Sequence, residues 1–285
     1  MNLRGYYSVL KPQRTLFNVV TTLAGYLLAT RWHIHWSVLL GVLGGTTLVV
    51  ASACAANNCT DRNLDARMPR TRKRVLVTKQ VSVQRAAWLG LVLGIAGFVL
   101  LGLYVNWLTV LLGAIGYIDY VVLYAWSKRR TPHSTLIGTV SGAVPIMAGY
   151  TAATGRVDLT ALLLGLILTA WQMSHFYAIG IFRHADYAAG KLPIWPVVKG
   201  DRSARDWIIT YTLLFVLCSA ALWAVGAAGV VYLVCMTAIG VAWLYVAVAG
   251  LKRPDLMRWA RQMFGYSLLV ILASSLLIAV GPILR

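Results

Sequence analysis

Nine apolar stretches, each close to the length that a helix needs to cross a bilayer, dominate this chain of 285 residues. Hydrophobic residues make up 59% of the chain and charged residues only 12%, so the apolar surplus must face lipid. The sequence therefore predicts an all-α polytopic membrane bundle of nine transmembrane helices, forming a single domain over residues 1–285. The expected spans are 15–31, 36–57, 86–104, 106–126, 134–153, 159–182, 207–226, 229–250 and 264–283.

The basic residues between these stretches are unevenly distributed. All but three of the 26 Lys and Arg precede the first stretch or fall in alternate connections; the exceptions are Arg31, Arg156 and Arg285. Positive charge collects on the cytoplasmic side of membrane proteins, which predicts the N-terminus inside and the C-terminus outside. The same placement accounts for the net charge of +18. We therefore expect a lipid bilayer, and no nucleic acid, as the partner. Because no transit segment precedes the first stretch, we expect a bacterial inner (cytoplasmic) membrane.

Two long loops, 58–85 and 183–206, both lie on the predicted cytoplasmic side. They are also the only loops with two or more acidic residues, so we expect them to form a polar cap that carries the chemistry. The four cysteines show no C-x-x-C spacing and are interpreted as small apolar fillers, not as disulfides or metal ligands. They are Cys54, Cys59, Cys218 and Cys235.

The first long loop begins with a regular series of oxygen-bearing side chains. The chain has only eight acidic residues, all Asp, and two of them follow Asn57 at four-residue intervals, as Asp61 and Asp65. On a helix these three positions share one face. Carboxylate and amide oxygens suit Mg²⁺, and the basic run that follows suits a phosphorylated substrate. The alternative is a solvated helix end whose aspartates pair with Arg62 and Arg67.

The second long loop could supply an opposing wall. Asp186 follows the sixth stretch and offers another carboxylate to a metal ion. Arg183 and Lys191 flank it and could hold phosphate, as could Lys199 further along. Pro193 and Pro196 would stiffen the backbone here.

Polar residues within the apolar stretches are costly unless they face a cavity or a partner. Gln172 and His175 lie in the sixth stretch; His175 could ligate haem iron, orient an acceptor, or be a hydrogen-bonded interior histidine. Asp119, in the fourth stretch, is a functional candidate unless protonation or a local hydrogen bond makes it structural. The nearby tyrosine rings could face a carbocation or simply pack. They belong to Tyr117, Tyr120 and Tyr124.

Asn57, Asp61 and Asp65 match the N-x-x-x-D-x-x-x-D signature of the intramembrane aromatic prenyltransferase (UbiA-type) superfamily, which the chain resembles. Within it, nearly the whole chain is similar to the protohaem IX farnesyltransferases, the haem branch. That similarity lies in Lys11-Pro12 with Asn18, Val49–Cys54, Arg70-Thr71, Arg74–Leu76, Lys128-Arg129, Gly142–Pro145, Trp171-Gln172 with His175, Asp186-Tyr187 and Pro193–Val198. Two positions depart from the pattern: Ser174 replaces the usual proline, and Gly190 follows Asp186 where other superfamily members have a second aspartate.

The resemblance implies transfer of a farnesyl group from farnesyl diphosphate to a vinyl group of haem B, which is a substrate and not a cofactor, forming haem O. Asp61, Asp65 and Asp186 would be the catalytic residues, and Asn57 would complete their Mg²⁺ ligand set. Terminal oxidases are the expected partners for haem delivery. Two alternatives stay open: a quinone-precursor prenyltransferase, and a transporter or proton-conducting protein with Asp119 and His175 as a relay. The residues expected to bind substrate are Asn18, Asn57, Arg70, Arg74, Lys128, Gln172, His175, Arg183 and Lys191.

Overall fold

Helices form the backbone framework of this computed structural model, which describes residues 3–283, and no strand occurs in that range. Helical hydrogen bonding satisfies the backbone within each segment, as lipid requires. Arg285, expected on the outer side, lies outside the described residues. The elements are α1 (Leu3–Val9), α2 (Pro12–Thr30), α3 (Trp36–Asp65), α4 (Val83–Tyr104), α5 (Trp107–Ile118), η1 (Asp119–Tyr124), α6 (Ala125–Ser127), α7 (Ser134–Thr154), α8 (Leu159–Phe182), α9 (His184–Ala189), α10 (Trp195–Lys199), α11 (Asp201–Ala224), α12 (Val230–Ala249), η2 (Gly250–Lys252) and α13 (Leu256–Val280).

The all-helical membrane bundle is confirmed, whereas the count of nine spans is not. Between residues 3 and 283, eight helical segments are long and apolar enough to cross a bilayer. The remaining long helix, α2, has 19 residues but carries Gln13, Arg14 and Asn18 in its first half, which lowers its hydropathy. The eight segments are α3, α4, Trp107–Ser127, α7, α8, α11, Val230–Lys252 and α13.

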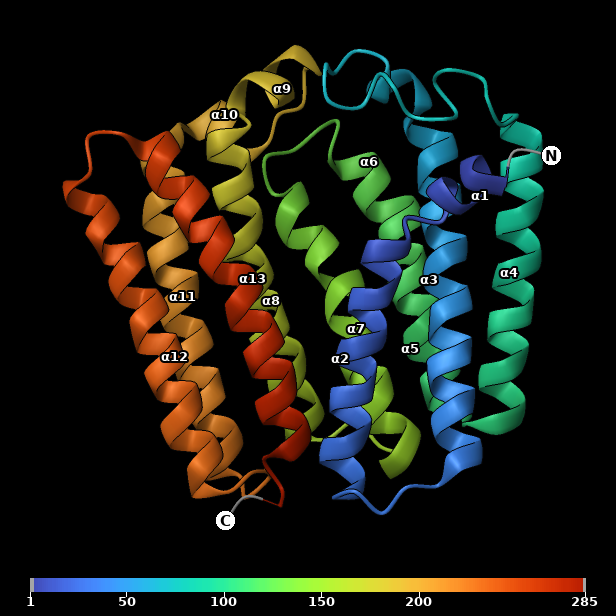
Figure 1. Ribbon diagram of the computed structural model, residues 1–285, viewed down its shortest axis with the longest axis vertical. Coiled ribbons are helices and arrows are strands. Elements are labelled where there is room, and N and C mark those ends of the chain that lie inside the picture. Colours follow the sequence, from blue (N-terminus) through green and yellow to red (C-terminus); the bar gives the residue numbers. More distant parts are fainter. Residues whose placement is uncertain (1–2, 284–285) are drawn as a thin grey trace.

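The two long loops lie at the same end of the bundle, called the loop end below (top of Figure 1). One joins α3 to α4 over residues 66–82, and the other joins α8 to α11 and contains α9 and α10. They meet through a small buried cluster formed by Met68, Leu192 and Ile194. Helix α1 also lies at the loop end, whereas α13 ends at the opposite end (Figure 1).

Helix α3 continues well past the expected end of its span. It runs unbroken for 30 residues, from Trp36 to Asp65. Asn57, Asp61 and Asp65 therefore all belong to a single regular helix that rises into the loop end. The face-sharing that their spacing predicts follows from this continuity.

Asp119 opens a π-helical turn, η1, within the segment Trp107–Ser127. Its carboxylate is buried and accepts a hydrogen bond from the backbone N–H of Ser141 in α7 at 3.0 Å. Pro145, one turn further along α7, has no N–H to offer the Ser141 carbonyl, so the helix lacks one hydrogen bond here. Asp119 thus links η1 to a weakened turn of α7, which favours its structural interpretation.

We expect Asp119→Asn to fold and to keep its activity, because the amide oxygen can still accept the Ser141 hydrogen bond. Asp119→Leu should destabilise the protein by about 1–3 kcal/mol, because it removes a buried hydrogen bond between η1 and α7. Thermal unfolding in detergent measures the difference. An Asn variant with a normal melting temperature but no activity would instead give Asp119 a chemical role.

Candidate active site

Helix α3 presents Asn57, Asp61 and Asp65 to the interior of the loop end. These three residues are only 3%, 7% and 3% exposed, respectively. The aspartates do not pair with the neighbouring Arg62 and Arg67, as a solvated helix end would require. Their ionic partners come from the loop after α3 and from the segment after α6, so the stripe is a buried polar site assembled by the tertiary structure.

Asp61 is paired with two cations that follow α6. Lys128 Nζ lies 2.5 Å from Asp61 Oδ2, and Arg129 approaches Oδ1 at 3.5 Å. Lys128 is itself buried, and burial lowers its pKa, while the Asp61 carboxylate opposes that shift. Its ammonium also lies 5.2 Å from the ring centre of Tyr124. Such a desolvated pair is strong only while both partners are present.

Asp65 is held by the loop that follows α3. Arg74 Nη1 donates to Asp65 Oδ2 at 2.6 Å. The hydroxyl of Thr71 donates to the Asp65 carbonyl at 2.9 Å, which fixes the loop as it turns back over the helix end. The basic run after the stripe therefore folds onto it, and Arg74 is the member that reaches a carboxylate.

Asn57 receives its partners from the N-terminal part of the chain and from η1. Lys11 Nζ donates to Asn57 Oδ1 at 2.9 Å, and the Tyr120 hydroxyl donates to the same oxygen at 3.3 Å. Arg14 in turn contacts the Tyr120 hydroxyl at 3.4 Å. Lys11 has a left-handed backbone, with φ 49°, which is uncommon for a residue with a side chain. Burial lowers the pKa of Lys11 to about 7, and the nearby Arg14 adds to the shift.

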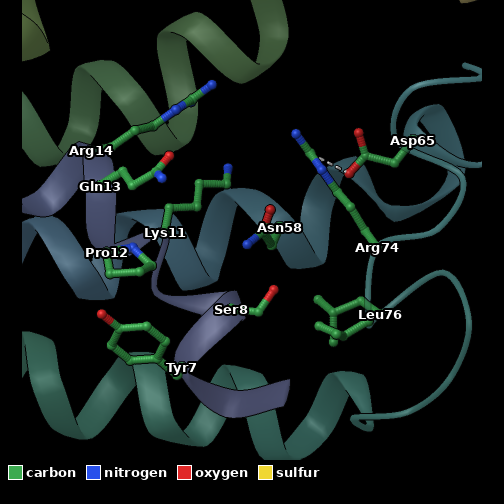
Figure 2. A pocket seen from close by; sticks show the side chains of 11 residues that line it. Tyr7, Ser8, Lys11, Pro12, Gln13, Arg14, Asn58, Asp65, Arg74 and Leu76 are labelled. Atoms are coloured by element: carbon green, nitrogen blue, oxygen red, sulfur yellow. Dashed lines mark hydrogen bonds and ion pairs between the residues drawn. The ribbon is translucent and has the colours of Figure 1, made fainter. Parts of the chain in front are cut away.

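A cavity of about 410 Å³ opens beside the stripe, between the α1–α2 junction, α3 and the loop after α3. Figure 2 shows Arg74 reaching Asp65 on one side of it, with Lys11 and Arg14 on the other. Three cations and one carboxylate thus line the space, an excess of positive charge that favours an anionic ligand. The remaining lining residues are Tyr7, Ser8, Pro12, Gln13, Asn58, Val75 and Leu76.

The second long loop, which the sequence predicts to face the stripe, is less directly involved in the site. Asp186, in α9, pairs with Arg183 at 3.7 Å. Among residues 3–283, no group of three or more His, Cys, Asp or Glu side chains is close enough to hold a metal ion. The same loop contributes Tyr187, whose pKa burial raises and nearby Arg70 lowers. In this conformation Asp186 therefore does not complete a carboxylate cluster with the stripe.

The other predicted substrate-binding residues are spread along the bundle. Gln172 Nε2 donates to the Thr139 carbonyl at 3.1 Å and so bridges α8 to α7. Asn18 Nδ2 donates to the Arg14 carbonyl one turn earlier in α2. His175 is buried against α13, while Arg70 and Lys191 are exposed at the loop end.

Sequence reasoning did not assign a site role to Lys11 or Arg14, and it considered Tyr120 only as a ring that could face a carbocation, not as a partner of Asn57. The Lys11-Pro12 pair entered only through family resemblance, and Arg14 only through the charge distribution. Their signal in the sequence is weak because Lys11 and Tyr120 lie 46 and 63 residues from Asn57, the residue that both contact. Such pairing depends on how α2 and η1 pack against α3.

The site residues fit Mg²⁺ together with a diphosphate. Asp61, Asp65 and Asn57 supply hard oxygen ligands on one face, which suit Mg²⁺. The amide nitrogen of buried Asn57 has no hydrogen-bond partner in the described chain, and as a donor it suits a phosphate oxygen. The surrounding ammonium and guanidinium groups match phosphate oxygens. This donor set would suit neither a thiolate-preferring nor an imidazole-preferring metal.

The chain is similar to known prenyltransferases. A family model described as the UbiA prenyltransferase family matches residues 18–269. Protoheme IX farnesyltransferase 1 of Shewanella frigidimarina is 43% identical, over 97% of this chain and 92% of that protein. Protoheme IX farnesyltransferase 2 of Pseudomonas putida (strain W619) is 41% identical, over 98% and 95%.

Solved structures show the same fold at low sequence identity. A digeranylgeranylglyceryl phosphate synthase superposes with a TM-score of 0.83 at 18% identity, covering 99% of this chain and 98% of that one. A UbiA homolog from Archaeoglobus fulgidus bound to GPP and Mg²⁺ gives 0.73 at 14% identity, covering 96% and 99%.

Proposed function

The chain belongs to the UbiA prenyltransferase family, and we propose that it transfers a farnesyl group from farnesyl diphosphate to a vinyl group of protohaem IX, forming haem O. The observation that carries the reaction is the buried Asn57–Asp61–Asp65 stripe, faced by cations from three other parts of the chain. The acceptor is supported by relatives 41–43% identical over at least 97% of this chain that are named protoheme IX farnesyltransferase.

Asp61 and Asp65, with Asn57, would hold Mg²⁺ on the diphosphate, and Asp186 would join them once the second loop closes. When bound, Mg²⁺ supplies Lewis-acid stabilisation of the charge that develops on the leaving group. Lys128 and Arg74 now neutralise the aspartates. When the diphosphate binds, Lys128 and Arg74 would neutralise its oxygens instead, together with Lys11 and Arg14. Arg70, Arg183 and Lys191 would assist from the loops.

The reaction is a substitution followed by hydration. The allylic C–O bond breaks with both electrons leaving on diphosphate, and the terminal vinyl carbon of haem forms the new C–C bond to the farnesyl cation. Water then adds to the adjacent cationic carbon and loses a proton, which gives a hydroxyethylfarnesyl substituent. The stacked rings of Tyr120 and Tyr124, with centroids 5.8 Å apart, could face the cation, and the apolar bundle excludes premature water.

The protein is a multi-pass membrane protein, and we propose a bacterial inner membrane with the loop end cytoplasmic. The basic residues of the loops support that orientation, which places the C-terminus outside. A single prenyltransferase domain over residues 1–285 and delivery of haem O to terminal oxidases complete the proposal.

Purified protein incubated with haem B, farnesyl diphosphate and Mg²⁺ should form haem O and release diphosphate, both measurable by chromatography. Removing Mg²⁺ with EDTA should stop the reaction, and restoring it should recover turnover. Prenylation of an aromatic quinone precursor without any haem product would contradict the acceptor. Proton flux in liposomes without prenyl transfer would instead support the transport alternative.

A further inference from the structure

His175 occupies a fixed position inside the bundle that the diphosphate site does not explain. It lies seven residues before the end of α8, about 10 Å below the loop end at the helical rise of 1.5 Å per residue. Only 8% of the residue is exposed. An ionisable ring at such depth in a membrane bundle is a functional candidate by default.

A hydrogen-bond chain in α13 determines which nitrogen of His175 carries the proton. The Ser267 hydroxyl donates to the Phe264 carbonyl at 2.6 Å, which commits its one hydrogen. Ser267 Oγ, 2.7 Å from His175 Nδ1, must then accept, so Nδ1 carries the proton. Nε2 is left with a free lone pair, the arrangement that metal-ligating histidines adopt when a second group holds the other nitrogen.

Nε2 has no hydrogen-bond partner among the described residues, and the residue keeps 8% of its surface exposed. The ring cannot turn away, because it stacks on Trp171 with centroids 4.8 Å apart and packs against Phe264 at 5.0 Å. Trp171 is itself anchored by donation to the Ser267 carbonyl at 2.7 Å.

We propose that His175 Nε2 is an axial ligand to the iron of the acceptor haem, held in that role by Ser267. This inference rests on the proposed haem substrate and deepens it by naming the contact that orients the ring. The aromatic side chains around His175 suit an apolar porphyrin face, and Phe17 of α2 extends them by stacking on Trp171 at 5.5 Å. Ligation holds the porphyrin plane and so presents a vinyl group to the farnesyl cation.

The test is spectroscopic and uses no farnesyl diphosphate. Full-length protein, purified without a histidine tag, is titrated with ferric haem B, and the Soret and visible bands are recorded. Wild type should show a histidine-ligated spectrum. His175→Ala should lose it, and added imidazole should restore it. Ser267→Ala should keep the ligated spectrum but weaken haem affinity about tenfold, the scale of losing a ligand's orienting partner.

His33→Ala is the matched control, because His33 is an exposed histidine in the turn between α2 and α3. It should bind haem as wild type does. An unchanged spectrum in His175→Ala, or its loss in His33→Ala instead, would overturn the ligand assignment. If the wild type makes haem O but never shows histidine ligation, the inference fails and the proposed function stands. If it neither binds nor farnesylates haem, both fail.

Discussion

Asp61→Asn should lower the rate of haem O formation on the order of a hundredfold or more, the scale of removing one preorganised electrostatic group from an active site. The amide keeps the shape of the side chain but removes the charge that Mg²⁺ and Lys128 both require. The fold should survive, because the amide oxygen still accepts from Lys128. The loss of stability in Asp61→Asn should stay below the ~3–5 kcal/mol that removing one partner of a buried pair outright would cost. Turnover and thermal unfolding are measured on the same preparation.

Two further variants separate catalysis from stability. Asp61→Asn combined with Lys128→Met should recover the melting temperature without recovering turnover, because no buried charge is then left alone. Asp206→Asn is the matched control: Asp206 also pairs with a cation, Arg205, but its side chain is 60% exposed. It should turn over normally. Retained activity in Asp61→Asn would refute the metal-binding role of the stripe.

Gly149→Ala should cost about 3 kcal/mol or more of stability, the upper range for overpacking a well-packed interior. A Cβ at Gly149 would lie 1.9 Å from the Thr22 carbonyl oxygen, and one at Gly25 would lie 2.1 Å from the Ile146 carbonyl oxygen. These reciprocal contacts bring α2 and α7 together backbone to backbone, as small residues allow in membrane bundles. Backbone atoms cannot rotate aside, so the helices must separate.

The same substitution should also reduce activity, because α2 carries Arg14 and follows directly from Lys11. Thermal unfolding and size-exclusion profiles in detergent measure the loss. Gly102→Ala and Gly265→Ala are the matched controls, since an added Cβ meets nothing within 4 Å at either helical position. Both should match or slightly exceed wild-type stability. If Gly149→Ala melts like these controls, the close α2–α7 packing is wrong.

Much of the fold follows from local properties of the sequence. Hydropathy over windows of about 20 residues predicts membrane helices, because transferring each segment into lipid depends mainly on its own composition. The expected boundaries agree with the structure at α7 and α8 to within a residue. The difference at α2 has a local cause as well, since Gln13, Arg14 and Asn18 lower the hydropathy of its first half.

The stripe on α3 is likewise a local prediction. Four-residue spacing places Asn57, Asp61 and Asp65 on one face of any regular helix, and α3 is regular through Asp65. The identity of their partners is not local. Lys128 lies 67 residues from Asp61, and no periodicity in the sequence relates the two.

The sequence by itself determined a helical membrane protein with an acidic stripe, a basic loop end and the family to which they belong. Only the tertiary structure decided which cations face which carboxylates, that Asp119 braces α7, and that Ser267 sets the tautomer of His175. The physical reason is the separation along the chain over which each kind of interaction acts. Helix formation and membrane insertion depend on neighbours within a turn or a span, whereas ion pairs and tautomers depend on atoms a few ångströms apart in space. Helix packing brings those atoms together from distant positions in the chain.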